Sequence, residues 1–258
     1  MDYSVVIPCY NEESNLGRLV DGLRPVLRDL GPAESTEVIL VDDGSTDSTW
    51  PRLTRLAEEG LLGCTVRLER HEPNRGLGAA LRTGFAASSG RIIITTDSDG
   101  TYRFSEIPKL MSRMSADVGI VTASPYHPEG GVQNVPPYRL ILSRGSSLIY
   151  RALVDRRIHT YTALFRAYRS DVIKTVEFKS DGFLAVAELL VNAKLAGFRV
   201  VEYPAVLHSR VGGVSKARLA RTIVAHVRFQ FNILMRRMGY VRRRRSAEDA
   251  TLELAQRR

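Results

Sequence analysis

The first hundred residues alternate between short apolar runs and amphipathic stretches, and this alternation constrains the fold more than any other feature of the sequence. Buried strands are predicted for the runs YSVVIP, TEVILV, CTVRLER and RIIITTD. The stretches between them place apolar residues at helical spacing, as in ESNLGRLVDGLRPVL. Strands that alternate with helices are typical of a parallel sheet covered by helices. We therefore predict an α/β fold with a mostly parallel sheet.

Beyond residue 100 the alternation is less regular. Helices are predicted for IPKLMSRM, YRLILSRGSSLIYRALV and LAVAELLVNAKLAG, and strands for VGIVTAS and for FRVVEYPAVL, which would be the last strand. The stretch YHPEGGVQNVPP is rich in Gly and Pro and predicts a long loop of the kind that shapes a site. With 258 residues, the chain suits one large α/β domain or two small ones.

Cysteine content and the first residues indicate the compartment. The two cysteines, Cys9 and Cys64, are too few for a disulfide framework, which fits a reducing cytosol. The start MDYSVVIPCYNE lacks the basic and apolar regions of a signal peptide, and no run reaches the roughly 18 to 20 apolar residues that span a bilayer. We therefore expect a cytoplasmic protein without a transmembrane anchor.

The net charge of +9 comes from one segment. Residues 216–245 hold ten Lys or Arg and no Asp or Glu, whereas the other 228 residues carry 27 basic and 28 acidic side chains. Because the basic residues are confined to one segment, the net charge gives little support to the interpretation that the protein binds nucleic acid. Apolar residues recur at helical spacing among the arginines, namely Leu219, Ile223, Val227, Phe231 and Leu234. The pattern predicts a basic amphipathic helix that lies on an anionic membrane surface, or whose apolar stripe packs on the domain.

Four polar loops follow the first predicted strands, and their sequences are PCYNE, DDGSTD, HEPNRG and DSDG. In an open α/β sheet, ligands bind beyond the carboxyl ends of the strands, so these loops predict one ligand site. In DSDG, Asp97 and Asp99 would face the same side if the strand continued that far. Two anions held so close repel each other. A hard divalent cation bound by oxygen ligands is the simplest candidate to lie between them.

Eight segments of the chain, in order, match the pattern of a known family. They are VVIPCYNEESNL, VILVDDGSTDST, NRGLGAALRTG, DSDG, SRG, FRAYR, AGFRVVEYP and RVGGVSK, and they extend over about residues 3–216. In these segments the chain resembles the inverting glycosyltransferases of the GT-A fold, family 2, and among them the polyprenyl-phosphate branch that includes dolichol-phosphate mannose synthase. The resemblance implies a Rossmann-like GT-A catalytic domain over residues 1–215. The pattern of the residues after it predicts the basic helical extension 216–245 and a flexible tail, 246–258.

The resemblance implies a donor site made of two parts. Asp97 and Asp99 would bind Mg²⁺ or Mn²⁺ against the diphosphate of a nucleotide sugar, and Asp99 is counted as catalytic because the cation offsets charge as the leaving group departs. The nucleoside would be bound by Pro8, Tyr10, Glu12 and Asp42, where carboxylates accept hydrogen bonds from base and ribose.

The resemblance also implies cationic contacts to both phosphate groups. Arg210, Ser215 and Lys216, in RVGGVSK, would clamp the donor diphosphate, with Lys216 counted as catalytic. Arg144, in SRG, would meet the acceptor phosphate and is also counted as catalytic. Arg166, in FRAYR, would orient the same region.

Three departures from the branch bear on the sugar and on the acceptor. Thr101 stands where the branch commonly has Gln, and its hydroxyl cannot reach as far as an amide. Pro125 stands where the branch has a phosphate-binding arginine. The branch typically has an acidic residue followed shortly by TSGFR. This chain instead reads HTYTALFR, with His159, Thr160 and Leu164 at or near those positions.

The implied reaction is inverting transfer of a sugar from a GDP- or UDP-sugar to a polyprenyl phosphate at the cytoplasmic face of a membrane, where an anchoring subunit could be a further partner. A phosphate monoester is already anionic at pH 7, so this reaction needs positioning and charge neutralisation more than a general base. A hydroxyl acceptor on a polysaccharide, lipid or metabolite is the alternative, and it would require a base such as Asp181, Glu188 or His159. A third interpretation is a non-catalytic domain that binds a nucleotide or a partner, with the arginines contacting RNA or protein.

Overall fold

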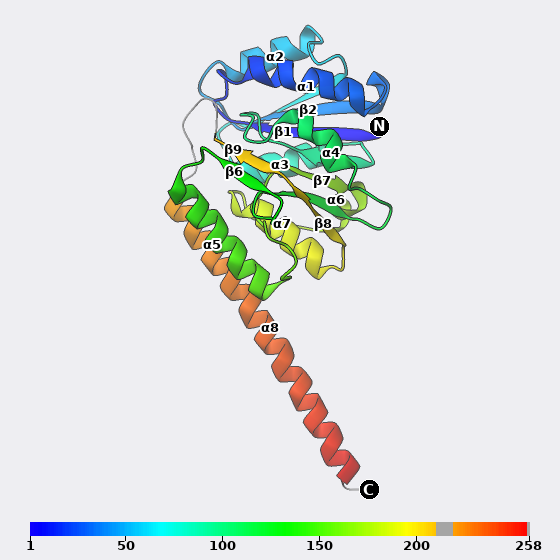
Figure 1. Ribbon diagram of the computed structural model, residues 1–258, viewed down its shortest axis with the longest axis vertical. Coiled ribbons are helices and arrows are strands. Elements are labelled where there is room, and N and C mark those ends of the chain that lie inside the picture. Colours follow the sequence, from blue (N-terminus) through cyan, green and yellow to red (C-terminus); the bar gives the residue numbers. More distant parts are fainter. Residues whose placement is uncertain (210–218, 257–258) are drawn as a thin grey trace. The chain divides into compact units, whose positions relative to one another are not determined.

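The computed structural model of the protein describes the backbone of residues 1–209 and 219–256 and the side chains of residues 1–209 and 220–239 (Figure 1). Within these residues, the main sheet has seven strands in the order β3-β2-β1-β4-β7-β5-β8, and β7 alone runs antiparallel to its neighbours. The predicted mostly parallel sheet is thus confirmed. The strands are β1 (Tyr3–Cys9), β2 (Thr36–Asp42), β3 (Thr65–Arg70), β4 (Ile92–Thr95), β5 (Ile120–Ser124), β7 (Arg166–Arg169) and β8 (Val200–Pro204).

Helices cover both faces of this sheet (Figure 1). On one face α1, α2 and α4 share a hydrophobic core with the strands, and on the other face α3 contacts β1, β2 and α7. Because both faces are covered, β1 and β2 are continuous apolar runs without polar alternation. The helices are α1 (Leu16–Leu30), α2 (Thr49–Glu58), α3 (Leu77–Ala87), α4 (Ile107–Met111), α5 (Pro137–Leu153), α6 (Ser170–Thr175) and α7 (Leu184–Leu195), with short 3₁₀ turns at η1 (Ala33–Ser35) and η2 (Phe104–Glu106).

A second, two-stranded parallel sheet pairs β6 (Gly131–Gln133) with β9 (Val206–His208). It corrects two predictions. The stretch 126–137 contains β6 and is not an uninterrupted loop, and the predicted last strand FRVVEYPAVL is divided into β8 and β9. Strands of three residues carry too short a pattern to be seen in a sequence, because their pairing depends on what lies beside them in the fold.

The chain divides into two compact units, Met1–Ala217 and Arg218–Arg258. In the second unit, α8 runs from Leu219 to Gln256, so the predicted tail has a helical backbone over residues 246–256, and its flexibility stays a prediction. No helix in the described part of the chain contains a stretch apolar enough to cross a bilayer. Large apolar side chains of α8 are exposed, namely Ile223, Val224, Val227, Phe231, Leu234, Met235 and Met238.

Candidate active site

The polar loops singled out in the sequence all follow strands that end at one edge of the main sheet. Strands β1, β2, β3, β4, β5 and β8 are parallel and share this carboxyl edge. Strand β7 runs the other way, and its first residue, Arg166, pairs with both Thr95 in β4 and Thr122 in β5. Residues 159–165, which precede β7, therefore reach the same edge as the loops that follow β4 and β5.

Hydrogen bonds join the loop after β1 to the loop after β2. Asn11 N donates to Ser45 Oγ at 2.9 Å, and Asn11 Oδ1 accepts from Thr46 N at 2.7 Å. Glu12 N donates to Thr49 Oγ1 at 2.7 Å. The motifs PCYNE and DDGSTDST therefore form one structural unit. Short polar side chains are needed in both because they bond to the backbone of the other loop.

Asp43 fixes the loop after β3, a role missed from the sequence. Its buried carboxylate lies 2.7 Å from His71 Nδ1 and accepts from Asn74 Nδ2 at 2.7 Å and Gly76 N at 2.8 Å. Gly44 beside it has φ of 72°, and a Cβ there would lie 2.4 Å from Asn74 N. The signal available was the Asp-Gly pair directly after a buried strand, which required a turn residue with positive φ.

Asp42 and Glu12 make the edge over β1 and β2 acidic. Asp42 is fully buried at the end of β2; its Oδ2 has no hydrogen-bond partner among the described residues and lies 3.5 Å from Arg70 Nε. Burial, together with the charges of Glu12 and Asp42, raises the pKa of the neighbouring Cys9 thiol. A buried carboxylate oxygen with spare acceptor capacity suits the N–H and O–H donors of a base or ribose.

Pro8 and Tyr10 flank the end of β1, and both are partly buried. Val6 O accepts from Thr96 N at 3.3 Å, so the backbone of Val6 faces β4. The backbone of Pro8, two residues further along β1, faces the same side. The β1–β4 ladder ends at the pair Val6 and Thr95, so Pro8 interrupts no hydrogen bond of that ladder. Contact of Pro8 and Tyr10 with a nucleoside stays a prediction.

Asp97 and Asp99 lie in a turn and not on a strand. Because β4 ends at Thr95, the shared orientation expected for alternate strand residues does not apply, and that expectation is corrected. The turn is held by the side chain of Asp99, whose Oδ1 accepts from Thr101 N at 3.0 Å and from the Thr101 hydroxyl. Thr101 therefore orients the carboxylate of Asp99.

The chemistry of this turn fits a hard divalent cation. Asp97 and Asp99 supply carboxylate oxygens, and Asp99 is buried. Burial, followed by the charge of Asp97, raises the pKa of the Tyr102 phenol, which stacks on Phe165 with ring centroids 5.3 Å apart. Within the described residues, no group of three or more His, Cys, Asp or Glu could hold a metal ion. Two carboxylates leave other coordination positions of such a cation for diphosphate oxygens and water, which is how Mg²⁺ is commonly bound.

The two arginines predicted for the acceptor region have different environments. Arg166 is fully buried, and its guanidinium donates to Thr122 Oγ1 at 2.9 Å and to the carbonyl of Tyr161 at 2.7 Å. It holds the segment before β7 against β5, and it can act on an acceptor only by orienting that segment. Arg144, on α5, is exposed, and its Cζ lies 5.1 Å from the ring centroid of Tyr126.

A cluster of ionisable groups is formed by Glu202 in β8, His127 in the loop after β5 and His159 in the segment before β7. His159 Nδ1 lies 2.7 Å from Glu202 Oε2, and Glu202 Oε1 accepts from the N–H groups of His159 at 2.7 Å and Thr160 at 3.0 Å. The rings of His127 and His159 meet edge to face, with centroids 5.4 Å apart. His159 was a predicted base candidate, but His127 and Glu202 were missed. Glu202 could have been found, because an acidic residue inside an apolar strand needs a partner.

The other two base candidates have structural partners. The carboxylate of Glu188 accepts from Lys179 N at 3.2 Å and Ser180 N at 2.9 Å, and no arginine of the described residues bonds to it. Asp181 pairs with Arg82, and its carbonyl accepts from Gly78 N at 2.6 Å. Gly78 thus allows close approach between α3 and the segment before α7.

The predicted diphosphate clamp, formed by Arg210, Ser215 and Lys216, lies outside the described residues. Its role stays a prediction.

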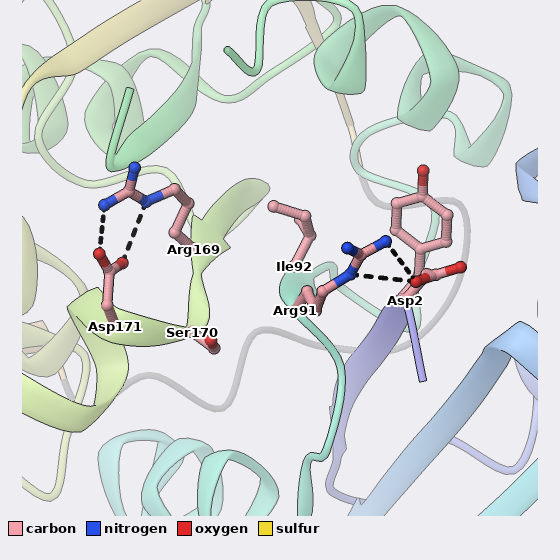
Figure 2. A pocket seen from close by; sticks show the side chains of 7 residues that line it. Asp2, Arg91, Ile92, Arg169, Ser170 and Asp171 are labelled. Atoms are coloured by element: carbon pink, nitrogen blue, oxygen red, sulfur yellow. Dashed lines mark hydrogen bonds and ion pairs between the residues drawn. The ribbon is translucent and has the colours of Figure 1, made fainter. Parts of the chain in front are cut away.

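A separate hollow of about 440 Å³ lies at the opposite, amino edge of the sheet (Figure 2). Figure 2 shows Arg91 paired with Asp2 and Arg169 paired with Asp171 in its wall. Each guanidinium there is balanced by its own carboxylate, so the hollow has little net charge with which to attract an anionic substrate. The polar loops of the carboxyl edge therefore remain the candidate site.

Comparison with known sequences identifies related proteins. Residues 4–177 match the model of glycosyl transferase family 2. Dolichol-phosphate mannosyltransferase of Pyrococcus furiosus is 31% identical over 236 residues, which are 91% of this chain and 64% of that protein. Polyprenol monophosphomannose synthase of Mycolicibacterium smegmatis is 33% identical over 220 residues, 82% of this chain and 79% of that protein. Undecaprenyl-phosphate 4-deoxy-4-formamido-L-arabinose transferase of Pseudomonas paraeruginosa is 33% identical over 173 residues, which are 67% of this chain and 48% of that protein. The chain thus spans less than two thirds of the first of these relatives.

Comparison with solved structures confirms the predicted GT-A fold. Glucosyl-3-phosphoglycerate synthase of Mycobacterium tuberculosis, in complex with Mn²⁺, UDP and phosphoglyceric acid, superposes with a TM-score of 0.65 at 20% identity, over 89% of this chain and 78% of that one. Its complex with Mg²⁺ and UDP gives a TM-score of 0.66 at 19% identity, over 89% and 79%.

Proposed function

Because this chain belongs to glycosyl transferase family 2, we propose that it transfers a sugar from a nucleoside diphosphate sugar to a polyprenyl phosphate. The observation that carries the proposal is the agreement among three relatives. Their names differ in the sugar, which is mannose in two and a formamido-arabinose in the third, but each name includes a polyprenyl or dolichyl phosphate. The acceptor class is therefore better supported than the sugar.

The acidic half of the site suits the donor. Asp42 and Glu12, at the ends of β2 and β1, offer carboxylate acceptors to the base and ribose, and Oδ2 of the buried Asp42 accepts no hydrogen bond from the described residues. Asp97 and Asp99, after β4, would hold Mg²⁺ or Mn²⁺ at the diphosphate. When bound, the cation offsets the negative charge that develops on the departing nucleoside diphosphate. The complexes of the related fold with Mn²⁺ or Mg²⁺ and UDP are consistent with this assignment.

The transfer itself needs few protein groups. An oxygen of the acceptor phosphate forms a bond to C1 of the sugar, and the bond from C1 to the diphosphate oxygen breaks with its electron pair remaining on the diphosphate. Attack from the opposite face inverts the configuration at C1. No proton has to be removed from the anionic nucleophile, so the protein contributes by positioning both substrates and by neutralising their charges.

Exposed apolar side chains support a membrane-surface location, where a lipid-linked phosphate would be presented, and we place it at the cytoplasmic face as part of the proposal. On α5, Tyr138, Ile141 and Leu148 are 55%, 70% and 64% exposed. On α8, Val224 and Phe231 are 66% and 58% exposed, and exposed arginines lie along the same helix. Apolar side chains among arginines suit an interface with anionic lipid, where each nearby cation contributes about 1 kcal/mol.

The test is a screen of GDP- and UDP-sugars against a short polyprenyl phosphate with Mg²⁺ or Mn²⁺, with product detected by mass. We expect a glycosyl phosphate of the polyprenol from at least one donor. Turnover with a hydroxyl acceptor and none with any polyprenyl phosphate would refute the proposal.

The arrangement of His159 and Glu202 favours one alternative, a hydroxyl acceptor. An imidazole oriented by a carboxylate at 2.7 Å is the usual arrangement of a general base. In that case the rate would depend on deprotonation of the imidazole, and removal of the ring would lower kcat rather than acceptor affinity.

A further inference from the structure

The order of the strands in the sheet indicates the direction in which a bound donor extends across the site. The nucleoside groups follow β2 and β1, and Asp97 and Asp99 follow β4, the next strand in the sheet. A donor bound to these groups extends from base to diphosphate to sugar along that direction. The acceptor must approach C1 on the side away from the diphosphate, so its head group lies over the strands beyond β4, which are β7, β5 and β8.

Cationic and hydrogen-bonding groups gather over those strands. The loop after β5 carries Tyr126 and His127, and the ring of Tyr126 contacts the guanidinium of Arg144. The segment before β7 carries His159, whose ring meets that of His127. The side chain of His159 is 22% exposed, while that of its partner Glu202 is 7% exposed, so the imidazole lies between the carboxylate and solvent.

One nitrogen of each imidazole is fixed by the protein. His127 Nδ1 accepts from the backbone N–H of Glu129 at 3.2 Å, which leaves the proton of the neutral ring on Nε2. His159 Nδ1 faces the carboxylate of Glu202 and donates to it. Among the residues that the structure describes, Nε2 of neither ring has a hydrogen-bond partner. Two imidazole nitrogens are therefore available to a ligand at the acceptor end of the site.

We propose that His127 and His159 together bind the phosphate of the acceptor, and that Glu202 is the positioning residue that holds His159 in place. The proposal rests on the proposed function and adds the groups that recognise the acceptor's head. Glu202 orients the ring of His159 because its carboxylate lies 2.7 Å from Nδ1, so Nε2 is the ring nitrogen left for the phosphate. It also holds the backbone of residues 159 and 160, which fixes the height of the ring above the sheet.

Substitution of either histidine by Asn removes the imidazole Nε2 and keeps the hydrogen bond that Nδ1 makes in the wild type. In His159→Asn, the amide Nδ2 takes the place of imidazole Nδ1 and still donates to Glu202. In His127→Asn, the amide Oδ1 still accepts from the N–H of Glu129, as in an Asx turn. We expect each substitution to raise KM for a short polyprenyl phosphate about tenfold, the range for a hydrogen bond to a charged group. KM for the nucleotide sugar and kcat should stay within about twofold.

The positioning role has its own variant and control. Glu202→Gln keeps an oxygen for the two backbone N–H groups but removes the negative charge facing His159, and should raise KM for the acceptor severalfold at an unchanged melting temperature. Glu129→Gln alters an exposed side chain beside His127 while its backbone N–H remains, and should leave all constants unchanged.

The outcomes separate the two proposals. Acceptor KM values that equal the wild type in both Asn variants would overturn the two-imidazole site while leaving the transferase function intact. A hundredfold loss of kcat at constant KM would also overturn it, because His159 would then act as a base. Absence of transfer to polyprenyl phosphate by the wild-type enzyme, with turnover of another acceptor, would remove both proposals.

Discussion

The two halves of the sheet's carboxyl edge carry groups of opposite charge. Over β2, β1 and β4 the edge is acidic, with Asp42, Glu12, Asp97 and Asp99. Over β7, β5 and β8 it presents imidazole rings and the guanidinium of Arg144, and Glu202 in this half is already engaged by His159 and the backbone. Both proposed substrates carry phosphate, yet among the described residues only the half over β7, β5 and β8 presents donors and positive charge of this kind to phosphate.

This difference indicates where a cation is required. A diphosphate near four carboxylates would be repelled, so we expect a divalent cation, in addition to the predicted clamp of Arg210 and Lys216, to change the sign of the local charge in the donor half. The acceptor half already provides donors and positive charge. We therefore expect metal and donor binding to depend on each other, and acceptor binding to depend on neither Asp97 nor Asp99.

The largest effect is expected from Asp99→Asn. Loss of a carboxylate ligand should lower kcat by about a thousandfold or more, because a cation supplies several kcal/mol of charge stabilisation and each 1.36 kcal/mol corresponds to tenfold in rate. The measurement is kcat under saturating substrates, with the melting temperature as a check on folding. Asp171→Asn, in the hollow at the opposite edge, is the matched control and should retain full activity. Full activity of Asp99→Asn would remove the metal role from this account.

Asp42→Asn should act on the donor alone. The amide keeps the shape of the buried side chain but loses the charge that strengthens hydrogen bonds to the nucleoside. Such bonds are worth about 1.5–3 kcal/mol, so KM for the nucleotide sugar should rise about ten- to hundredfold. KM for the acceptor should not change. A rise in acceptor KM at constant donor KM would reverse the assignment of the two halves.

Thr101→Val should weaken metal binding without removing a ligand. The hydroxyl of Thr101 donates to Asp99 Oδ1, and groups that orient metal ligands typically contribute ten- to hundredfold in affinity. We expect the Mn²⁺ concentration for half-maximal activity to rise about tenfold. Thr101→Ser keeps the hydroxyl and should behave as wild type. Equal metal dependence in Thr101→Val and Thr101→Ser would show that the hydroxyl has no such role.

The smallest effect concerns the segment that carries His159. Lys194 Nζ lies 2.8 Å from Asp155 Oδ2, and bonds from Lys194 and Arg157 N lower the pKa of the Asp155 carboxyl although burial opposes them. A folded-state pKa below the unfolded value gives stability that is present above about pH 4 and is lost as pH falls through the folded pKa. Asp155→Asn should therefore cost about 1 kcal/mol in free energy of unfolding at pH 7 and less at pH 3, as measured by urea denaturation. A cost that is the same at both pH values would contradict this.

Local patterns were sufficient to predict most of the fold. The apolar runs of β1, β2 and β5 are long enough to identify buried strands, and the polar loops after β1 to β4 could be placed at one edge from the α/β alternation alone. Strand β6 and the separation of β9 from β8 could not be predicted, because strands of three residues carry no usable period. The antiparallel insertion of β7 between β4 and β5 depends on tertiary pairing, which no local pattern reports.

The candidate site was predicted less completely than the fold. Asp97 and Asp99 were identified by their spacing, but the sequence could not show that β4 ends before them or that Thr101 orients Asp99. Arg166 was identified by resemblance, and its complete burial follows from its place in a central strand. His127 and Glu202 lie 75 residues apart in the chain, and only the pairing of β5 with β8 brings strand residue Glu202 near the loop after β5 that carries His127.

The central claim is that Asp97 and Asp99 bind a divalent cation together with the donor diphosphate. Isothermal titration of Mn²⁺ into the protein, with and without saturating GDP or UDP, tests it most directly. We predict that one of the nucleotides tightens Mn²⁺ binding at least tenfold in the wild-type protein, and that this coupling is lost in Asp97→Asn and in Asp99→Asn. Mn²⁺ binding that is equally tight in these variants, or unaffected by either nucleotide in the wild type, would contradict the account.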